Sequence, residues 1–480
     1  MRNAELVSKY FSLNRTQSQL DFVDVPVNTD TPLYVDPFAI SQRVDRWSQE
    51  AHGSILAYFQ RVVDSIRDDH IEEARSLLQH LREPNETHLG QSRGRSKGAG
   101  IGDEQANRLL IALRQSSAVQ TGFLSSLAEC ELMIDGIGPD KISDLTTNII
   151  RQQLAEYTLQ QCELLGISTE EVAIGPCFDR DSLRWESKYL RLPVAYGSPL
   201  LLVPKAIARM RFSYDHQQYY RHFTLSYLQA EHLQAGTALV HTLRNGKRKV
   251  YKEELEKYFP CTKSFLFEFS KNHPGVLDEY RDFLADLEEK GSVHALEGDN
   301  EPVVASALRA ALRSIPKGRQ AASLYHSLMI GVVEFLLFPQ LLRPIKEKEI
   351  NDGRKRIDIL MENGAREGIF HRLHDIRKLP CAYVPIECKN YSEDLKNPEL
   401  DQMIGRFSTN RGRVGIICCR GFEDRPLFIK RCQDTLSAQL GLILPFDDAV
   451  IDELLELVET DHRKDVDIRI SKIVDEVWLA

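Results

Sequence analysis

The chain has 480 residues, of which 42% are hydrophobic and 27% charged, and its net charge is −9 at neutral pH. This length can bury two or three hydrophobic cores, and the acidic balance excludes a protein that binds nucleic acid through its overall charge. Nine scattered cysteines, an odd number, argue against a disulfide framework, and no apolar run reaches the ~20 residues that span a bilayer. We therefore expect a cytoplasmic protein with no membrane partner.

The first 295 residues predict an α+β region that senses, targets or dimerises, with a possible subdivision near residue 170. A polar linker over 291–302 would separate it from a second domain over 303–480. The hydrophobic patterns predict short strands and turns over 20–45, helices over 50–82, 103–116 and 140–166, a mixed α+β segment over 176–230, and a charged helical stretch over 252–289.

A polar, glycine-rich loop over 90–102 is the most distinctive feature of this first region. Its glycines would let backbone amides approach an anion, and Arg93, Arg95 and Lys97 would supply positive charge. The loop lacks the GK[ST] ending of a P-loop, and no clear strand precedes it. Two interpretations stay open, a phosphate-binding loop that gates the protein by nucleotide sensing and an ordinary surface loop.

The last third of the chain alternates helical and strand patterns. An Asn-Asp-Gly turn precedes one short β-branched run, and Asn397 followed by Pro398 is typical of a helix start. The pattern predicts a helix over 323–341, strands over 356–361 and 383–389, a helix over 398–407, a strand over 413–419, a helix over 426–440 and a strand over 441–446.

Two of these strands carry residues that could bind a metal ion. Asp358 lies in the first, and Glu387-Cys388-Lys389 ends the second. Because strand side chains alternate between faces, Glu387 and Lys389 share one face, and the backbone carbonyl of Cys388 lies beside them. Two carboxylates and one carbonyl suit Mg²⁺ or Mn²⁺, while the amine of Lys389 could orient the attacking water.

In this order and on these elements, the residues resemble the PD-(D/E)xK nuclease superfamily, the fold of many restriction enzymes and Holliday-junction resolvases. The resemblance implies an α/β core with a mixed central sheet flanked by helices, joined here to a larger N-terminal α+β region. It also implies that Glu334, inside an apolar helix, completes the metal or water network, and that Gln402 orients Lys389 or the phosphate. Ile357 stands where the family name has Pro.

Positive charge gathers in the candidate catalytic domain. Residues 301–440 hold 23 Lys and Arg against 17 Asp and Glu, so the remainder of the chain is strongly acidic. Seven of these basic residues are candidates for phosphate contacts, either in the insertion between the two catalytic strands or near the following helix: Arg366, Arg372, Arg377, Lys378, Arg406, Arg411 and Arg413.

The sequence thus predicts a Mg²⁺-dependent endonuclease that hydrolyses phosphodiester bonds in DNA, typical of a bacterial restriction or anti-phage effector. A homodimer or higher oligomer would suit double-strand cleavage, and a separate ATPase or sensor protein could be a partner. Two alternatives stay open. The fold could be a catalytically inactive DNA-binding scaffold, or the N-terminal region could gate the nuclease through a bound nucleotide.

Overall fold

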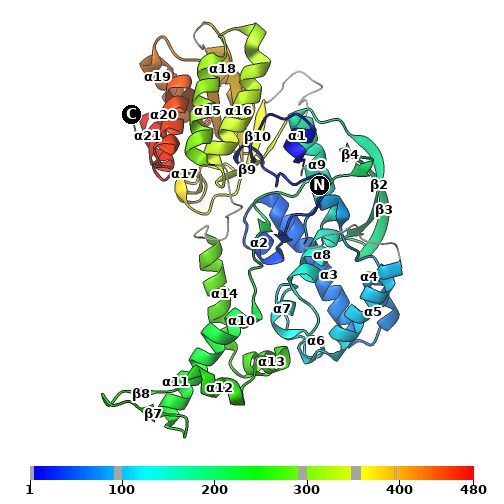
Figure 1. The fold of residues 1–480 in the computed structure, drawn as a ribbon. Helices are drawn as coiled ribbons and strands as arrows, with labels where there is room; N and C mark the ends of the chain where they lie inside the picture. Colours follow the sequence, from blue (N-terminus) through cyan, green and yellow to red (C-terminus); the bar gives the residue numbers. More distant parts are fainter. Residues whose placement is uncertain are drawn as a thin grey trace.

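The computed structural model describes residues 5–90, 100–289, 300–346, 358–393, 395 and 397–479, with only the backbone described at 100–105 and 289. Figure 1 shows an elongated molecule with a sheet-containing C-terminal domain at one end and a helical N-terminal region below it. An arm made of residues 216–289 extends to the other end. Two hydrophobic cores underlie this arrangement, one within residues 7–284 and one formed by Leu164 and residues 304–477.

The C-terminal domain is built on a five-stranded mixed sheet in the order β13-β12-β11-β10-β9. The first three strands in that order are parallel, and β10 is antiparallel to both of its neighbours. Every residue of β12 and β13 is buried, as expected for parallel strands covered on both faces. The strands are β9 (Leu341–Ile345), β10 (Ile359–Asn363), β11 (Tyr383–Lys389), β12 (Val414–Cys419) and β13 (Leu442–Asp447).

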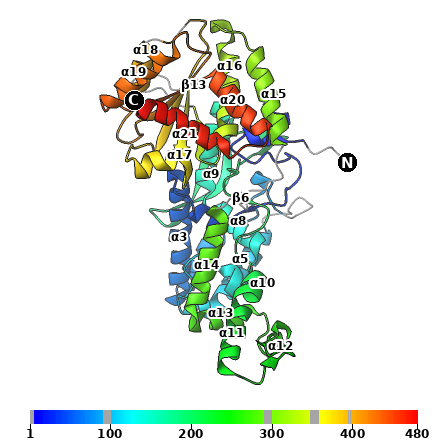
Figure 2. The ribbon, with the colours of Figure 1, turned by 90° about the vertical axis from the view of Figure 1, so that its left-hand side faces the viewer.

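Helices cover this sheet (Figure 2). α16 packs on β9, β11 and α15, while α19, α20 and α21 pack against β13. Asp424 and Asp447 cap α19 and α20 by accepting backbone N–H groups of the first turn. The helices are α15 (Glu301–Ser314), α16 (Ala322–Leu337), α17 (Gly368–His371) with a π-helical turn (Arg372–Ile376), α18 (Asn397–Ile404), α19 (Arg425–Ser437), α20 (Asp448–Glu459) and α21 (Asp465–Trp478).

One helical segment in the described part of the chain, Arg319–Leu337, is long and apolar enough to cross a bilayer. In the structure, 61% of its most apolar stretch is buried inside the C-terminal domain, where it contributes to the core.

The N-terminal region is mainly helical and carries a long two-stranded ribbon, β2 (Glu170–Asp179) paired with β3 (Arg184–Leu192). Two smaller strand pairs join distant segments, β1 (Tyr34–Val35) with β6 (Ala208–Arg209) and β4 (Val194–Ala195) with β5 (Ser198–Pro199). The helices are α1 (Val7–Tyr10), α2 (Pro37–Ser41), α3 (Arg46–Arg67), α4 (Ile71–Leu78), α5 (Gly100–Gln115), α6 (Ser117–Gln120), α7 (Cys130–Met133), α8 (Pro139–Ile149) and α9 (Arg151–Leu165), with 3-10 turns at Gln17–Gln19 and Asn85–Thr87.

The arm is held together by aromatic packing. The Tyr280 ring lies 5.1 Å from that of Tyr219 and 5.0 Å from that of Phe223, and both tyrosines are fully buried. The arm consists of α10 (His216–Gln218), a π-helical turn (Tyr219–Thr224), α11 (Leu225–Ala235), the hairpin of β7 (His241–Thr242) and β8 (Arg248–Lys249), α12 (Lys252–Tyr258), α13 (Lys263–Asn272) and α14 (Pro274–Glu289).

The observed elements differ from the predicted ones in several places. The helix predicted over 140–166 is two helices, α8 and α9, and the strand predicted over 356–361 is β10, at Ile359–Asn363. The helix predicted over 323–341 ends at Leu337, because Phe338 precedes a proline and is extended, with ψ 137°. The strand β9 follows where that helix was expected to continue. The helix predicted over 50–82 is two helices, with Asp69 at φ +61° between them.

The two regions meet across buried charges. The Arg343 guanidinium on β9 lies 2.6 Å from both Asp45 and Glu362, and the Arg343 backbone N–H donates to Asp21 at 2.9 Å. All four side chains are buried. Because an unpaired buried charge is costly, these contacts hold the C-terminal domain in one position on the N-terminal region.

Candidate active site

The candidate catalytic residues meet at one edge of the sheet. Glu387 and Lys389 end β11, and Asp358 directly precedes β10, the antiparallel neighbour of β11. Since Ile359 pairs with Ile386, Asp358 lies beside the end of β11. Its carboxylate accepts the backbone N–H of Cys388 at 2.6 Å. The two acidic side chains therefore lie side by side, Glu387 within β11 and Asp358 just before β10, one residue outside the strand in which the sequence pattern places it.

Glu387 is the centre of the hydrogen-bonded cluster. It is 1% exposed, and its two carboxylate oxygens accept from Lys389 Nζ at 2.9 Å and from Arg406 Nε at 3.1 Å. Lys389 Nζ also donates to Gln402 Oε1 at 3.0 Å. Gln402 and Arg406 lie on and just after α18, four residues apart, so both reach the same side of β11.

The cluster sets two carboxylates, those of Asp358 and Glu387, against two cations, Lys389 and Arg406. Burial raises the pKa of Glu387, and the nearby charge of Asp358 raises it further. The ammonium of Lys389 lowers this pKa but does not cancel the rise. Burial by itself would lower the pKa of Lys389, but the charge and hydrogen bond of Glu387 raise it overall. Lys389 is therefore a charged ammonium, and the two carboxylates repel one another.

The donor set fits a hard divalent cation. In the described part of the chain, no group of three or more His, Cys, Asp or Glu side chains could hold a metal ion. The oxygen donors available here are the carboxylates of Asp358 and Glu387 and the backbone carbonyl of Cys388. Mg²⁺ accepts such a small protein share because it retains several waters, and its charge would relieve the repulsion between the two carboxylates.

Glu334 lies elsewhere. Its carboxylate pairs with Lys205 of the N-terminal region at 2.8 Å and is 1% exposed. On the same helix, eight residues or about 12 Å earlier, the His326 ring nitrogen lies 3.3 Å from the backbone oxygen of Asp358. Contrary to the expectation for Glu334, the residue of α16 that reaches the cluster is His326, which the sequence reasoning missed.

The basic insertion lies at the other end of the strands. It joins the end of β10 to the start of β11, about 16 Å along the strand from Asp358. Arg372 pairs with Asp467 at 3.2 Å and Arg377 with Asp475 at 2.9 Å, both on α21. The insertion is thus a folded segment docked on α21, so this placement does not support phosphate contacts beside the carboxylate cluster.

The other predicted basic residues are also separated from the cluster, apart from Arg406, which is buried against Glu387. Lys378 is exposed at the end of the insertion, and Arg366 lines a cavity of about 540 Å³ with Asp467. The backbone of Arg411 bonds Tyr383 at the start of β11, and that of Arg413 bonds Pro380. Arg93, Arg95 and Lys97 lie outside the described residues.

A basic loop that the sequence reasoning missed does border the cluster. Asn390 follows Lys389 directly, and its amide nitrogen donates to the carbonyls of Pro316 at 3.1 Å and Gly318 at 2.8 Å. The Gly318 N–H donates back to the Asn390 carbonyl at 2.9 Å. The loop 316–319 is thereby fixed beside β11, with the side chains of Lys317 and Arg319 exposed.

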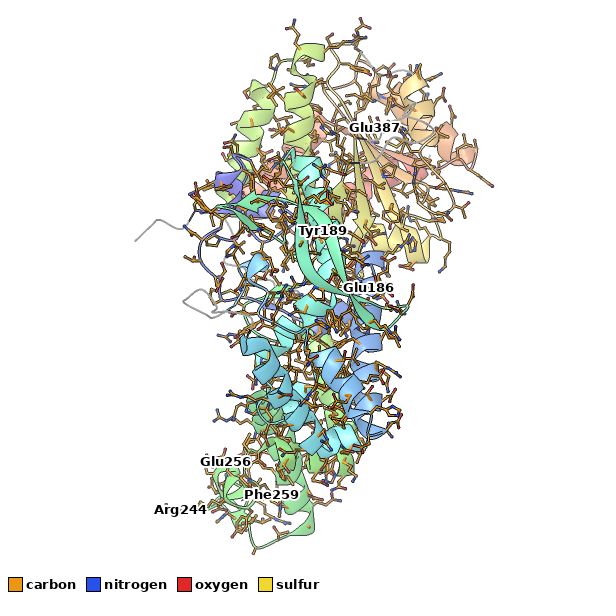
Figure 3. All side chains as sticks on the ribbon, turned by 90° about the vertical axis from the view of Figure 1, so that its right-hand side faces the viewer. Glu186, Tyr189, Arg244, Glu256, Phe259 and Glu387 are labelled. Atoms are coloured by element: carbon orange, nitrogen blue, oxygen red, sulfur yellow. The ribbon has the colours of Figure 1, made fainter. Side chains whose placement is uncertain are left out.

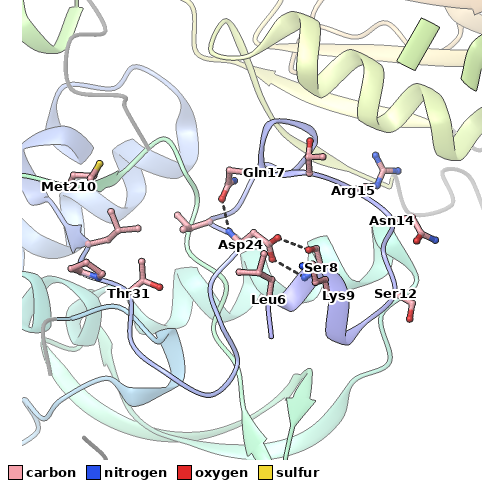
Figure 4. Close-up of a pocket in the computed structure, with 14 residues that line it drawn as sticks. Leu6, Ser8, Lys9, Ser12, Asn14, Arg15, Gln17, Asp24, Thr31 and Met210 are labelled. Atoms are coloured by element: carbon pink, nitrogen blue, oxygen red, sulfur yellow. Dashed lines mark hydrogen bonds between the residues drawn. The ribbon is translucent and has the colours of Figure 1, made fainter. Parts of the chain in front are cut away.

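A separate cavity of about 800 Å³ lies under the N-terminal segment (Figure 4). Its lining mixes apolar residues such as Leu33 and Met210 with polar ones such as Asp24, which accepts from the backbone and hydroxyl of Ser8. Arg15, at its edge, donates to the carbonyl of Ser327 on α16 at 2.7 Å. Arg15 thus joins the edge of the cavity to the helix that carries His326, and the cavity lining does not include the carboxylate cluster.

Comparison with known protein families finds a match within the N-terminal region. Residues 12–215 match the model of a family described as Domain of unknown function (DUF8370). No curated protein and no solved structure matches the chain. The matched segment includes most of the cavity-lining residues and ends before the arm, and the carboxylate cluster at 358–406 lies outside it.

Proposed function

We propose that this protein is a metal-dependent nuclease of the PD-(D/E)xK type that hydrolyses phosphodiester bonds in DNA. One observation carries the proposal. One hydrogen-bonded cluster lies at the ends of two neighbouring strands in the mixed five-stranded sheet. It is formed by Asp358, Glu387, Lys389 and Gln402, which lie at β10, β11 and α18. A large accessory region joined to such a domain is typical of bacterial restriction and anti-phage effectors, and we extend the proposal to that class by analogy.

Each residue has a definable role. Asp358 and Glu387 would hold Mg²⁺ with the carbonyl of Cys388, and the bound ion would act as a Lewis acid and ease ionisation of the attacking water. Lys389 is charged, so it orients the water and offsets charge on the phosphate, and does not serve as a base. Gln402 fixes the ammonium of Lys389, and Arg406 fixes the carboxylate of Glu387.

The loop beside Asn390 would contact the DNA backbone. Lys317 and Arg319 are exposed on a segment that three hydrogen bonds join to the residue after Lys389. A phosphate next to the scissile one could therefore bind there, since backbone contacts position a duplex without reading its sequence.

The test is cleavage of plasmid and linear DNA with Mg²⁺, Mn²⁺ or EDTA. Asp358→Ala and Lys389→Ala should each lower the cleavage rate by on the order of 10³-fold, about 4 kcal/mol. Asp375→Ala and Lys430→Ala, which remove exposed charges of the same sign away from the cluster, should cleave like the wild type.

Two results would point to other functions. Wild-type protein that binds DNA but never cleaves it, with Mg²⁺ binding that survives Asp358→Ala, would favour a scaffold whose carboxylates are structural. Cleavage that appears only when a nucleotide is added would favour the gated nuclease.

A further inference from the structure

The β7–β8 hairpin concentrates positive charge at the tip of the arm. Residues 244–249 read Arg-Asn-Gly-Lys-Arg-Lys, with four basic residues and no acidic one, in a chain of net charge −9. All four basic side chains are exposed. Figure 1 shows the hairpin at the opposite end of the molecule from the sheet, and Figure 3 labels Arg244 there and Glu387 in the C-terminal domain.

Core packing does not explain this hairpin. Its strands have two residues each, and all four of those residues are exposed. The turn is tight, with the Leu243 N–H donating to the Lys247 carbonyl at 2.8 Å and Gly246 at φ +78°. An isolated two-stranded hairpin is marginally stable in water, so this one depends on its anchors to the arm.

Two of the basic residues serve as those anchors. Arg248 donates to the carbonyl of Leu233 on α11 at 2.8 Å, and Lys249 Nζ lies 4.6 Å from the centre of the Tyr251 ring. Within the described residues, neither Arg244 nor Lys247 makes an ion pair. The hairpin is therefore a fixed support that presents these two charged side chains to an outside partner.

We propose that this hairpin binds the phosphate backbone of double-stranded DNA. It would be a second contact on the duplex that the C-terminal domain cleaves, a role that rests on the proposed function. Closely spaced cations match the dense charge of a duplex, while the neighbouring Glu254 pairs with His241 of β7 at 2.7 Å. A two-stranded ribbon is also narrow enough to enter the major groove. An anionic membrane is a poorer fit, because only half-buried Leu243 supplies an apolar side chain at the turn.

The position of the hairpin predicts a dependence on duplex length. A compact chain of this size has a diameter of roughly 60 Å, and this molecule is elongated. At ~3.4 Å per base pair, a duplex that reaches both the hairpin and the cluster needs at least about 18 base pairs. A duplex of 12 base pairs can reach the cluster without the hairpin.

The experiment measures DNA binding by the full-length Asp358→Ala protein, so that cleavage does not interfere. A second protein adds Arg244→Ala and Lys247→Ala, leaving Arg248 and Lys249 to hold the hairpin. Its affinity for a 60-base-pair duplex should fall at least about tenfold, and the slope of log K against log salt should shrink by about 2. Equal affinity and slope in the two proteins would overturn the proposal.

Controls separate a local effect from a general loss of charge. Arg67→Ala and Lys472→Ala remove two exposed basic side chains elsewhere and should leave affinity unchanged. The charge-preserving pair Arg244→Lys and Lys247→Arg should also bind normally. The DNA assignment would be overturned if the hairpin substitutions abolished binding to an RNA duplex or to phosphatidylserine vesicles and left DNA binding intact.

Cleavage assays keep the two proposals apart. In the catalytically intact protein, the two hairpin substitutions should slow cleavage of the 60-base-pair duplex and leave that of a 12-base-pair duplex unchanged. If both lengths are cut like wild type and binding is unaltered, the hairpin proposal fails and the nuclease stands. If wild type cuts nothing while DNA binding depends on the hairpin, the hairpin contact stands and the nuclease fails.

Discussion

The ammonium of Lys389 is held from two sides, by Glu387 and by Gln402. Gln402→Leu removes one acceptor of a charged hydrogen bond, which contributes about 1.5–3 kcal/mol. We expect kcat for DNA cleavage to fall about 10- to 100-fold, with little change in DNA affinity. Gln402→Glu, which keeps an acceptor in place, should recover part of the rate. A rise in KM with unchanged kcat would contradict the positioning role.

Asn390 allows a separate test of the loop that it holds. Asn390→Ala removes the hydrogen bonds to the carbonyls of Pro316 and Gly318, so Lys317 and Arg319 lose their fixed position. We expect KM for DNA to rise about tenfold, with a smaller effect on kcat. Lys317→Ala combined with Arg319→Ala should give a similar rise, and adding Asn390→Ala to that pair should have little further effect. Fully additive effects would mean that Asn390 acts by another route.

The proximity of Asp358, Glu387, Lys389 and Gln402 was predicted from the resemblance to the PD-(D/E)xK superfamily. Strand alternation and the helix start indicated only the local direction of each side chain. The position of α16 could not be predicted. Whether Glu334 or His326 of this helix meets the strands depends on where the helix crosses the sheet, which tertiary packing decides. Asn390 was missed because a single asparagine after a strand has no distinctive pattern.

At the scale of elements, β11 lies over the predicted residues and β12 begins one residue later than predicted, since buried β-branched runs mark strands clearly. β9 was missed because Leu341 and Leu342 continue the apolar pattern of α16. The basic insertion between β10 and β11 was expected beside the metal. Because these strands are antiparallel, the insertion lies at the end of β10 and the start of β11. Asp358, at the start of β10, is therefore at the far end.

The docked insertion makes a prediction that separates stability from binding. Arg372 and Arg377 pair with carboxylates of α21, and Arg377 also lies over the Trp478 ring at 4.8 Å. Replacing both with Ala should cost about 1–2 kcal/mol, given partly exposed pairs and one cation–π contact. Thermal unfolding should shift down by about 2–8 °C, while DNA affinity and its salt dependence stay unchanged. Weaker DNA binding with unchanged stability would restore these residues as phosphate contacts.

At the scale of the whole molecule, residues far apart in sequence make one buried charged interface. Arg343 meets Asp45 and Asp21 across some three hundred residues of chain. No local pattern could have predicted these pairs, because each is an ordinary charged residue in its own segment. Arg15 and Lys205 extend the same interface to α16, so the N-terminal region contacts both the sheet and the helix that carries His326.

Glu334 gives this interface a pH dependence. The pKa of Glu334 is raised from 4.5 to about 7. Burial is the main cause and the charge of Asp21 adds to it, while Lys205 and Arg15 lower the pKa. Between these values the folded state binds a proton that the unfolded state has lost, so the free energy of unfolding falls as pH rises from about 4.5 to about 7. The contribution of Glu334 to the free energy of unfolding is at most about 3 kcal/mol, and it is fully present only below pH 4.5.

Glu334→Gln should remove that dependence. We expect the thermal midpoint of the variant to vary less than that of wild type between pH 5 and 7, as measured by circular dichroism or calorimetry. The advantage of wild type should be largest at pH 5 and should shrink towards pH 7, because Glu334 then ionises and its burial becomes costly. Glu253→Gln, at an exposed position on the arm, should follow the wild-type curve at every pH. Parallel curves for wild type and Glu334→Gln would show that Glu334 has the same proton affinity in both states, and that its pairing with Lys205 is sufficient to keep it charged in the folded protein.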